Sequence, residues 1–307
     1  MTNPKIAILD LGTNTILLLI AEVLPNGHYQ VLSEDGEVVR LGEGIHHEPC
    51  FLPQAMERAY ACLERYKKQI EYFQCQRVIA VGTAGFRRAE NSGEFQQRVK
   101  DGLGIDIEII SGEREAQLIY QAAREDFPDL KAPLLVLDIG GGSTEFIFED
   151  EMGQVHENSL PFGVVRLTER FLVSDPPAAD QLAALDKFVL EELKKLPRIV
   201  GQVANLVATA GTPTTLCALA QDMTSYDPRR VQGARLSRAR IVELTRHLAS
   251  LPPDERSRIP CLPSRRADVI VAGADILLCV MSHFGLDELV VSDHGLRFGV
   301  LRAELMK

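Results

Sequence analysis

The sequence predicts an α/β fold with two similar halves, and three observations lead to this prediction. Residues 6–15 (IAILDLGTNT) are echoed by residues 134–143 (LLVLDIGGGS). Each copy is an apolar run that ends in an aspartate, Asp10 or Asp138, and continues into a turn of small residues. Apolar sequence resumes directly after each turn, which indicates strand, turn, strand. Strand-like and helix-like segments then alternate through both halves, as in α/β proteins.

The expected elements follow this pattern along the first half. Apolar side chains at helical spacing predict a helix over residues 53–73. Ser111 is a suitable N-cap for a helix that begins at residue 112 and runs to about residue 124. The other expected elements are strands over residues 28–41, 77–81 and 105–110 and a helix over residues 93–102.

Residues 126–133 contain two prolines and are the most linker-like stretch, so the predicted domains span residues 1–128 and 129–307. The second half repeats the opening strands and then becomes more helical. Its expected strands cover residues 134–137, 144–149, 155–160, 205–208 and 288–291, and its expected helices cover residues 164–171, 178–196, 211–220, 237–250, 265–282 and 296–306.

The doubled turn predicts a site for an anionic ligand. An aspartate at the carboxyl end of a buried strand can hold Mg²⁺ directly or through water. Glycine, serine and threonine leave backbone N–H groups available to phosphate oxygens, and glycine allows positive φ. No Gly-Lys-Ser/Thr follows either copy, which argues against a Walker-type loop. The alternative is two ordinary hairpins in which each aspartate caps its turn.

Composition limits the partners and the compartment. The 307 residues carry a net charge of −10, which disfavours a broad basic face for nucleic acid. No apolar run reaches the roughly 18 residues of a membrane span, and the apolar start contains Asp10 and Asn14, unlike a signal peptide. The six cysteines form no Cys-x-x-Cys pair, so reduced thiols and a cytoplasmic location are expected. We therefore expect neither nucleic acid nor membrane as a partner.

Several segments together carry a family resemblance. The two turns resemble the phosphate signatures of the actin, sugar kinase and chaperone-ATPase superfamily. Further segments narrow this likeness: GTAGFRRA at residues 82–89, ISGEREA at 110–116, SLPFGVVRLTE at 159–169, AGTPTTL at 210–216 and VSDHGLR at 291–297. In this order they resemble the exopolyphosphatase and guanosine pentaphosphate phosphohydrolase (Ppx/GppA) family over almost the whole chain.

The resemblance implies two ribonuclease H-like (actin-like ATPase) domains with an interdomain cleft. Asp10 and Asp138 would face one Mg²⁺, or another divalent cation, from opposite sides. Glu145 would be a second metal ligand or a group that hydrogen bonds to a ligand. The closing helix, residues 296–307, would pack back onto the first domain, and the family suggests a homodimer. The implied activity is a phosphoanhydride hydrolase that releases terminal orthophosphate from inorganic polyphosphate, or the 5′ γ-phosphate from guanosine pentaphosphate (pppGpp).

The resemblance also implies roles for individual side chains. Glu115 matches the catalytic glutamate that the family places before the alanine of its Ser-Gly-x-x-Glu-Ala segment. A carboxylate in the first turn of a helix is expected to have a low pKa, so Glu115 would orient the attacking water more than abstract its proton. Glu113 is the alternative base, and both glutamates could simply favour the helix N-terminus. Arg87 would brace the transferred phosphoryl group.

The remaining assignments concern binding. The expected phosphate-binding residues are Gly12, Thr13, Asn14, Gly140, Gly141, Gly142, Ser143 and Arg266. Gly211 and Thr212 resemble the superfamily's nucleoside-side turn, although Pro213 removes one backbone donor there. Phe298 stands where the family usually has glutamate, and no role is assigned to it. Two other classes stay open: an ATP-dependent phosphotransferase of the same superfamily, and a non-catalytic nucleotide-responsive binding protein.

Overall fold

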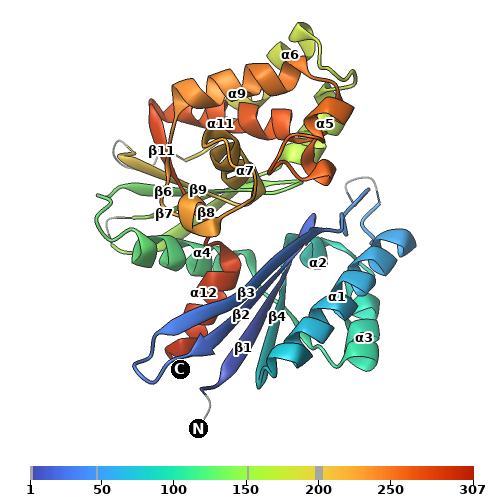
Figure 1. Ribbon diagram of the computed structural model, residues 1–307. Helices are drawn as coiled ribbons and strands as arrows, with labels where there is room; N and C mark the ends of the chain where they lie inside the picture. The colour runs from blue at the N-terminus through green and yellow to red at the C-terminus, as the bar shows by residue number, and fades with distance from the viewer. Residues whose placement is uncertain (1–2, 46–47, 151, 198–202) are drawn as a thin grey trace. The chain divides into compact units, whose positions relative to one another are not determined.

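The chain forms two compact units, each with its own β-sheet (Figure 1). The computed structural model describes residues 3–45, 48–150, 152–197 and 203–307. Unit 1 takes in Met1–Ile119 and Leu296–Lys307, and unit 2 takes in Tyr120–Gly295. The units therefore divide inside a helix, earlier than the expected boundary at residues 128 and 129, and the closing helix belongs to unit 1.

Unit 1 contains a mixed sheet with the strand order β3-β2-β1-β4-β5. Its first three strands are antiparallel neighbours, whereas β4 and β5 run parallel to β1. The strands are β1 (Lys5–Leu11), β2 (Thr15–Val23), β3 (Tyr29–Val38), β4 (Arg77–Gly82) and β5 (Ile107–Ile109).

Unit 2 repeats this arrangement with the strand order β10-β11-β9-β6-β7-β8. The antiparallel trio is now β6, β7 and β8, and β9 and β11 continue the sheet in parallel. The short strand β10, which the sequence analysis did not expect, extends the edge. The strands are β6 (Leu134–Ile139), β7 (Thr144–Glu149), β8 (Val155–Leu160), β9 (Asn205–Thr209), β10 (Arg235–Ser237) and β11 (Glu288–Val291).

The helices lie mostly where the sequence predicts them. In unit 1 they are α1 (Pro53–Phe73), α2 (Ala84–Arg88), α3 (Ser92–Leu103) and α12 (Leu296–Leu305), and α4 (Gly112–Asp126) crosses the division between the units. In unit 2 they are α5 (Val164–Phe171), α6 (Ala179–Leu193), α7 (Gly211–Ala220), α8 (Pro228–Val231), α9 (Arg238–Ser250), α10 (Pro253–Arg256), the 3₁₀ turn η1 (Ser264–Arg266) and α11 (Ile270–Phe284). No helix in the described ranges is long and apolar enough to cross a membrane.

One expected helix begins late. Residues 265–282 were expected to be helical, but the structure has the 3₁₀ turn η1 first and the α-helix from Ile270 onward. Within this 3₁₀ turn, the side chain of Arg266 is hydrogen bonded to Gly211 and Thr215 on α7. All six cysteines are unpaired in the structure.

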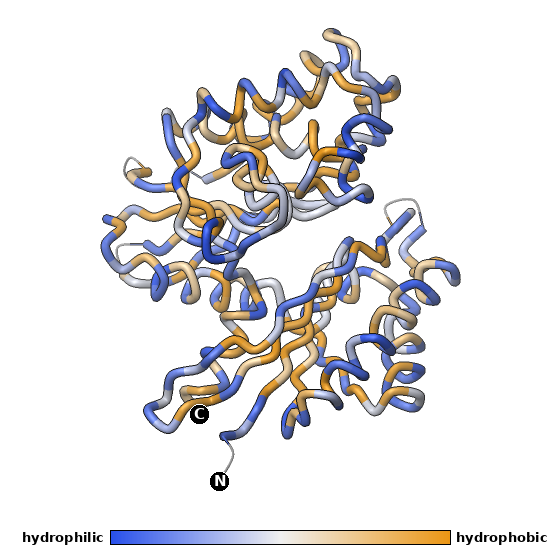
Figure 2. Tube along the Cα trace, viewed as in Figure 1, coloured by the Kyte–Doolittle hydropathy of each residue, from blue (hydrophilic) through white to orange (hydrophobic). Residues whose placement is uncertain are grey.

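Different helices pack on the two faces of the unit 1 sheet. Leu9, Leu11 and Leu18 belong to the apolar core that α1 shares. Figure 2 shows hydrophobic residues along these central strands. Because side chains alternate along a strand, Asp10 lies on the other face, where α12 packs against β1 and β2. A Cβ at Gly299 of α12 would lie 2.3 Å from the carbonyl oxygen of Leu118, so α12 and α4 are in backbone contact. This close packing explains why the end of the chain joins unit 1.

Each turn of the repeat is closed by the same backbone hydrogen bond. The amide of Gly12 donates to the carbonyl of Thr15 at 3.0 Å, and the amide of Gly140 donates to the carbonyl of Ser143 at 3.0 Å. The predicted strand, turn, strand is thus confirmed in both copies. These two amides are occupied within the turns, so they are not free to bind phosphate as expected.

In both units, the chain that follows the third strand holds the turn carbonyls from outside. In unit 1 the amides of Val39 and Arg40 donate to the carbonyl of Asn14 at 3.0 and 2.9 Å, and the amide of Gly42 donates to Thr13 at 2.8 Å. With the carbonyls tied in this way, the amides of Thr13 and Asn14 make no hydrogen bond within the described residues.

The start of α5 does the same for the second turn. Val164 donates to the carbonyl of Gly140 at 3.0 Å, and Val165 and Arg166 donate to the carbonyl of Gly141 at 2.9 and 3.1 Å. These contacts satisfy amides of the first helical turn that have no partner inside the helix. In the part of the chain that the structure describes, the amides of residues 141–143 make no hydrogen bond.

Lack of room for a Cβ atom, rather than positive φ, explains the glycines at positions 12 and 140. None of Gly12, Gly140, Gly141 or Gly142 is among the described glycines with positive φ, so the turns do not use this freedom of glycine. Instead, a Cβ on Gly12 or Gly140 would lie 3.0 or 3.1 Å from the carbonyl oxygen that closes the turn. At Gly163 a Cβ would lie only 2.4 Å from the carbonyl oxygen of Gly140.

We therefore predict that Gly163→Ala pushes α5 away from the second turn. An atom forced into backbone at this distance should lower the free energy of unfolding by about 2 kcal/mol, measured by urea denaturation. The matched control is Gly93→Ala, because a Cβ there has nothing within 4 Å. Equal stability of the two variants would contradict the prediction.

Unit 2 also buries a carboxyl group away from the turns. Asp275 lies on α11 among apolar side chains, and its Oδ2 atom has no hydrogen-bond partner in the described chain. Burial, followed by the charge of the nearby Asp186, raises the pKa of Asp275 from 3.8 to about 7. Asp186 accepts a hydrogen bond from the thiol of Cys279 at 3.6 Å. The folded protein therefore favours the neutral form of Asp275.

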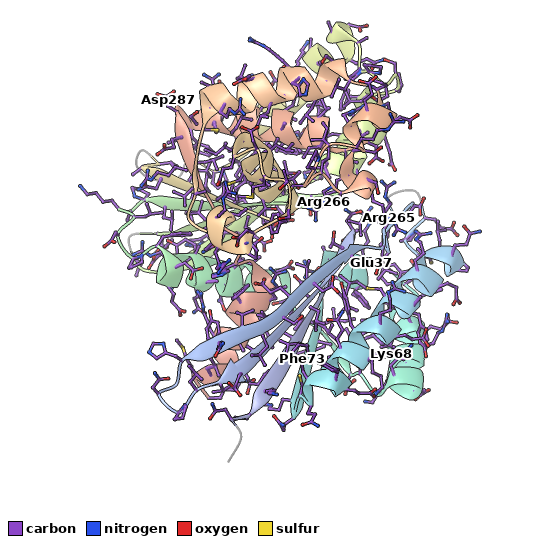
Figure 3. All side chains as sticks on the ribbon, viewed as in Figure 1. Glu37, Lys68, Phe73, Arg265, Arg266 and Asp287 are labelled. Carbon is purple, nitrogen blue, oxygen red and sulfur yellow. The ribbon has the colours of Figure 1, made fainter. Side chains whose placement is uncertain are left out.

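This burial predicts a specific pH dependence of stability. The stability that neutral Asp275 contributes is fully present below pH 3.8 and is lost as the pH rises toward 7. Asp275→Asn should consequently be more stable, relative to wild type, at pH 8 than at pH 4, by up to about 4 kcal/mol. Urea denaturation at both pH values measures this difference. The exposed Asp287 (Figure 3) supplies the control Asp287→Asn, which should show no such difference. A pH-independent effect of Asp275→Asn would contradict the assignment.

Candidate active site

The N-terminus of α4 positions the first candidate side chain. The hydroxyl of Ser111 accepts a hydrogen bond from the amide of Arg114 at 3.1 Å, which confirms the predicted N-cap. The amide of Ile110 donates to the carbonyl of Gly82 at 3.1 Å, so the helix starts beside the carboxyl end of β4. Glu115 therefore lies in the first turn of a helix that is fixed at both its cap and its leading strand.

Arg87 and Glu115 form a hydrogen-bonded ion pair in unit 1. Nη1 of Arg87 donates to Oε2 of Glu115 at 2.8 Å and to the carbonyl oxygen of Ile110 at 2.9 Å. Arg87 lies in the short helix α2 rather than in the expected turn. The start of α2 packs on the first phosphate turn, because a Cβ at Gly85 would lie 3.1 Å from Oγ1 of Thr13. The pair is thereby placed next to that turn.

Burial raises the pKa of two carboxyl groups in unit 1, those of Glu115 and Asp10. It raises the pKa of Glu115, and the pairing with Arg87 only partly opposes this. The expectation of a low pKa for Glu115 was wrong, because loss of hydration outweighs the favourable helix terminus. Burial, followed by the charge of Glu115, raises the pKa of Asp10 to about 7, while Arg297 lowers it. Glu113, the alternative base, is exposed and does not share these contacts.

The sequence analysis missed Arg297. This buried side chain on α12 forms an ion pair with Glu34 of β3, with Nη2 and Oε2 2.5 Å apart, and its charge acts on Asp10. The only signal in the sequence was its place in the segment 291–297. The next residue, Phe298, is fully buried, and its ring lies 6.4 Å from that of Tyr29. Its apolar character is thus explained by packing.

A polar row crosses the unit 2 sheet at the end of β6. Asp138 pairs directly with Glu145 on β7 and with Thr209 on β9, and Glu145 pairs with Ser159 on β8. Directly paired positions place their Cβ atoms about 5 Å apart on one face of a sheet. The hydroxyl of Ser159 donates to Oε1 of Glu145 at 3.1 Å. The two carboxylates predicted as metal ligands are therefore neighbours.

These donors fit a hard divalent cation. The described residues contain no group of three or more histidine, cysteine, aspartate or glutamate side chains suited to a metal. Mg²⁺, however, commonly binds through one or two carboxylates and completes its octahedral shell with water and substrate phosphate. Asp138 and Glu145 match that requirement.

Arg266 covers the predicted nucleoside-side turn. Its Nη1 donates to the carbonyl of Gly211 at 3.2 Å and to Oγ1 of Thr215 at 3.3 Å. A Cβ at Gly211 would lie 2.5 Å from the guanidinium carbon, so the guanidinium of Arg266 lies directly against this backbone. Figure 3 labels Arg266. Thr212 is buried, and its hydroxyl oxygen lies against Gly273. The turn of residues 211–212 is thus occupied by protein atoms.

The structure brings the predicted residues together within each unit. Unit 1 joins the Asp10 turn, Arg87 and Glu115, and unit 2 joins Asp138, Glu145 and the second turn, with Arg266 at the Gly211 turn. The expected approach of Asp10 and Asp138 to one cation concerns both units and stays a prediction.

Comparison with known sequences gives a consistent result. The sequence profile of the Ppx/GppA phosphatase family matches residues 19–307. The chain is 34% identical to exopolyphosphatase 2 of Mycobacterium tuberculosis over 98% of both chains. It is also 30% identical to a putative exopolyphosphatase of Haemophilus influenzae, over 97% of this chain and 90% of that protein.

Solved structures show the same fold. The Ppx/GppA family member of Aquifex aeolicus superposes with a TM-score of 0.82 and 35% identity, covering 99% of this chain and 98% of that one. An exopolyphosphatase of Cytophaga hutchinsonii superposes with a TM-score of 0.90 and 28% identity over 98% of both chains. The mixed α/β fold with two sheets thus matches proteins with two actin-like domains, as predicted. The chain belongs to the Ppx/GppA phosphatase family.

Proposed function

We propose that this protein is a Mg²⁺-dependent phosphoanhydride hydrolase that releases the terminal orthophosphate of inorganic polyphosphate. The observation that carries the proposal is the Arg87–Glu115 pair beside the Asp10 turn. Hydrolysis of a terminal phosphoryl group requires a positioned water, a base or orienting group, and neutralisation of developing charge. The exopolyphosphatases among the relatives support this substrate class.

Each part of unit 1 has a role in this proposal. The amides of Thr13 and Asn14, whose carbonyls are held from behind, bind phosphate oxygens. Arg87 uses one nitrogen for Glu115 and Ile110, and its other N–H groups brace the transferred phosphoryl group. The pKa of Glu115 is raised by burial, which brings this carboxylate closer to the range in which a general base works at neutral pH.

In this proposal, aspartate and glutamate side chains bind the Mg²⁺ ion. Asp138 and Glu145 would hold Mg²⁺, and the bound cation would neutralise charge on the phosphates. The amides of residues 141–143 would bind phosphate oxygens at the second turn.

Guanosine pentaphosphate is the second candidate substrate, because its 5′ γ-phosphate presents the same reacting group. A guanidinium such as that of Arg266 can stack on a base or pair with phosphate. The same side chain disfavours an ATP-dependent phosphotransferase, since it lies on the Gly211 turn where a kinase would contact adenosine.

The substrate is tested by measuring phosphate release from polyphosphates of several lengths, guanosine pentaphosphate and ATP, each with and without Mg²⁺. We expect Mg²⁺-dependent release from polyphosphate to be faster than from ATP. Phosphate release from guanosine pentaphosphate but not from polyphosphate would identify guanosine pentaphosphate as the substrate. Formation of ADP and a phosphorylated acceptor without free phosphate would refute hydrolysis.

Replacing the proposed base separates chemistry from binding. Glu115→Gln keeps the hydrogen-bonding shape but cannot take a proton, so kcat should fall at least about 100-fold with little change in KM. Steady-state phosphate release measures both constants. Glu113→Gln, two residues away and exposed, is the control and should stay within about twofold of wild type. Loss of activity in Glu113→Gln but not in Glu115→Gln would assign the role of the base to Glu113 instead.

A further inference from the structure

We infer that Ser159 is a positioning residue that orients Glu145 for cation binding. The inference rests on the proposed function, in which Glu145 and Asp138 hold the divalent cation. Ser159 is on β8, one strand beyond Glu145, and its hydroxyl donates to Oε1 at 3.1 Å. It contacts the carboxylate from the side opposite to Asp138, because β7 lies between β6 and β8.

The hydrogen bond determines which oxygen faces the phosphate turn. Oε2 of Glu145 lies 4.0 Å from the position of a Cβ on Gly140, and so does the hydroxyl oxygen of Ser143. With Oε1 held by Ser159, Oε2 is directed to the turn where the cation and phosphate are expected. A glutamate has three side-chain torsions, so fixing one oxygen removes much of the freedom that would otherwise oppose binding.

The first unit lacks this row, although its strands are arranged in the same way. There Asp10 pairs with Leu17 on β2, and Leu17 pairs with Gly36 on β3. A Cβ on Gly36 would lie 2.8 Å from a methyl carbon of Leu17, so the leucine fills the space of a side chain. The paired positions across the three strands thus carry Asp, Glu and Ser in unit 2, and Asp, Leu and Gly in unit 1. A difference of this kind at paired positions indicates a function specific to unit 2.

Packing does not explain the serine. Ser159 is exposed on β8, and its hydroxyl contacts Glu145 rather than a core group. Removing an exposed hydroxyl should cost little stability. Loss of an outer hydrogen-bond partner of a metal ligand, in contrast, commonly weakens metal binding by about 10–100-fold. Since this hydrogen bond is exposed, we expect the lower end of that range.

The experiment measures Mn²⁺ binding to the resting protein by electron paramagnetic resonance, without substrate. Ser159→Ala should bind Mn²⁺ about tenfold more weakly than wild type, with an unchanged melting temperature. Ser159→Thr keeps the hydroxyl and should bind nearly as tightly as wild type. Glu145→Gln should bind most weakly.

Thr144→Val is the matched structural control. Thr144 precedes Glu145 on β7, is fully buried on the opposite face and donates to the carbonyl of Phe162 at 2.7 Å. Its replacement should lower the melting temperature without changing the affinity for Mn²⁺. A similar loss of affinity in Thr144→Val and Ser159→Ala would reduce the serine to a structural role and overturn the inference.

The remaining outcomes distinguish the inference from the proposed function. Weak binding in Glu145→Gln together with wild-type affinity in Ser159→Ala would overturn the inference and leave the cation site intact. Equal Mn²⁺ binding by wild type and Glu145→Gln would overturn both the inference and the assignment of the cation to Glu145. Phosphate release by the wild-type protein, measured on the same preparation, tests hydrolysis separately.

Discussion

The site depends on one backbone constraint, which is the way each phosphate turn is held. The turns close on themselves through the amides of Gly12 and Gly140, and the following chain ties their carbonyls from outside. The carbonyls of Thr13, Asn14, Gly140 and Gly141 are occupied in this way, whereas the amides of Thr13 and Asn14 and of residues 141–143 make no hydrogen bond within the described residues. Such amides are the donors with which a protein of acidic net charge could bind an anion through its main chain.

Repetition of the fold does not mean repetition of the chemistry. Both units present an aspartate at the end of the first strand, but its neighbours differ. Unit 1 adds the Arg87–Glu115 pair, which suits the attack on a phosphoryl group. Unit 2 adds a second carboxylate, Glu145, next to Asp138, which suits a cation. In this interpretation, the two units divide the work of positioning and of charge neutralisation.

The return of the chain to unit 1 completes the electrostatics there. Helix α12 covers the face of the sheet that carries Asp10, and the tight contact at Gly299 keeps it close. The same helix brings Arg297, paired with Glu34, into the surroundings of Asp10. Without the positive charge of Arg297, burial under α12 would raise the pKa of Asp10 further.

The sequence alone determined the features that depend on neighbouring residues. The two turns, the bounds of α1 and the cap at Ser111 follow from local hydrophobic patterns and local hydrogen bonding, and all were predicted. Tertiary structure decided the pKa of Glu115, the place of Arg297, the position of Arg266 on Gly211 and the row from Asp138 to Ser159. Each of these depends on strand register or on contacts between residues far apart in the chain, which no local pattern encodes.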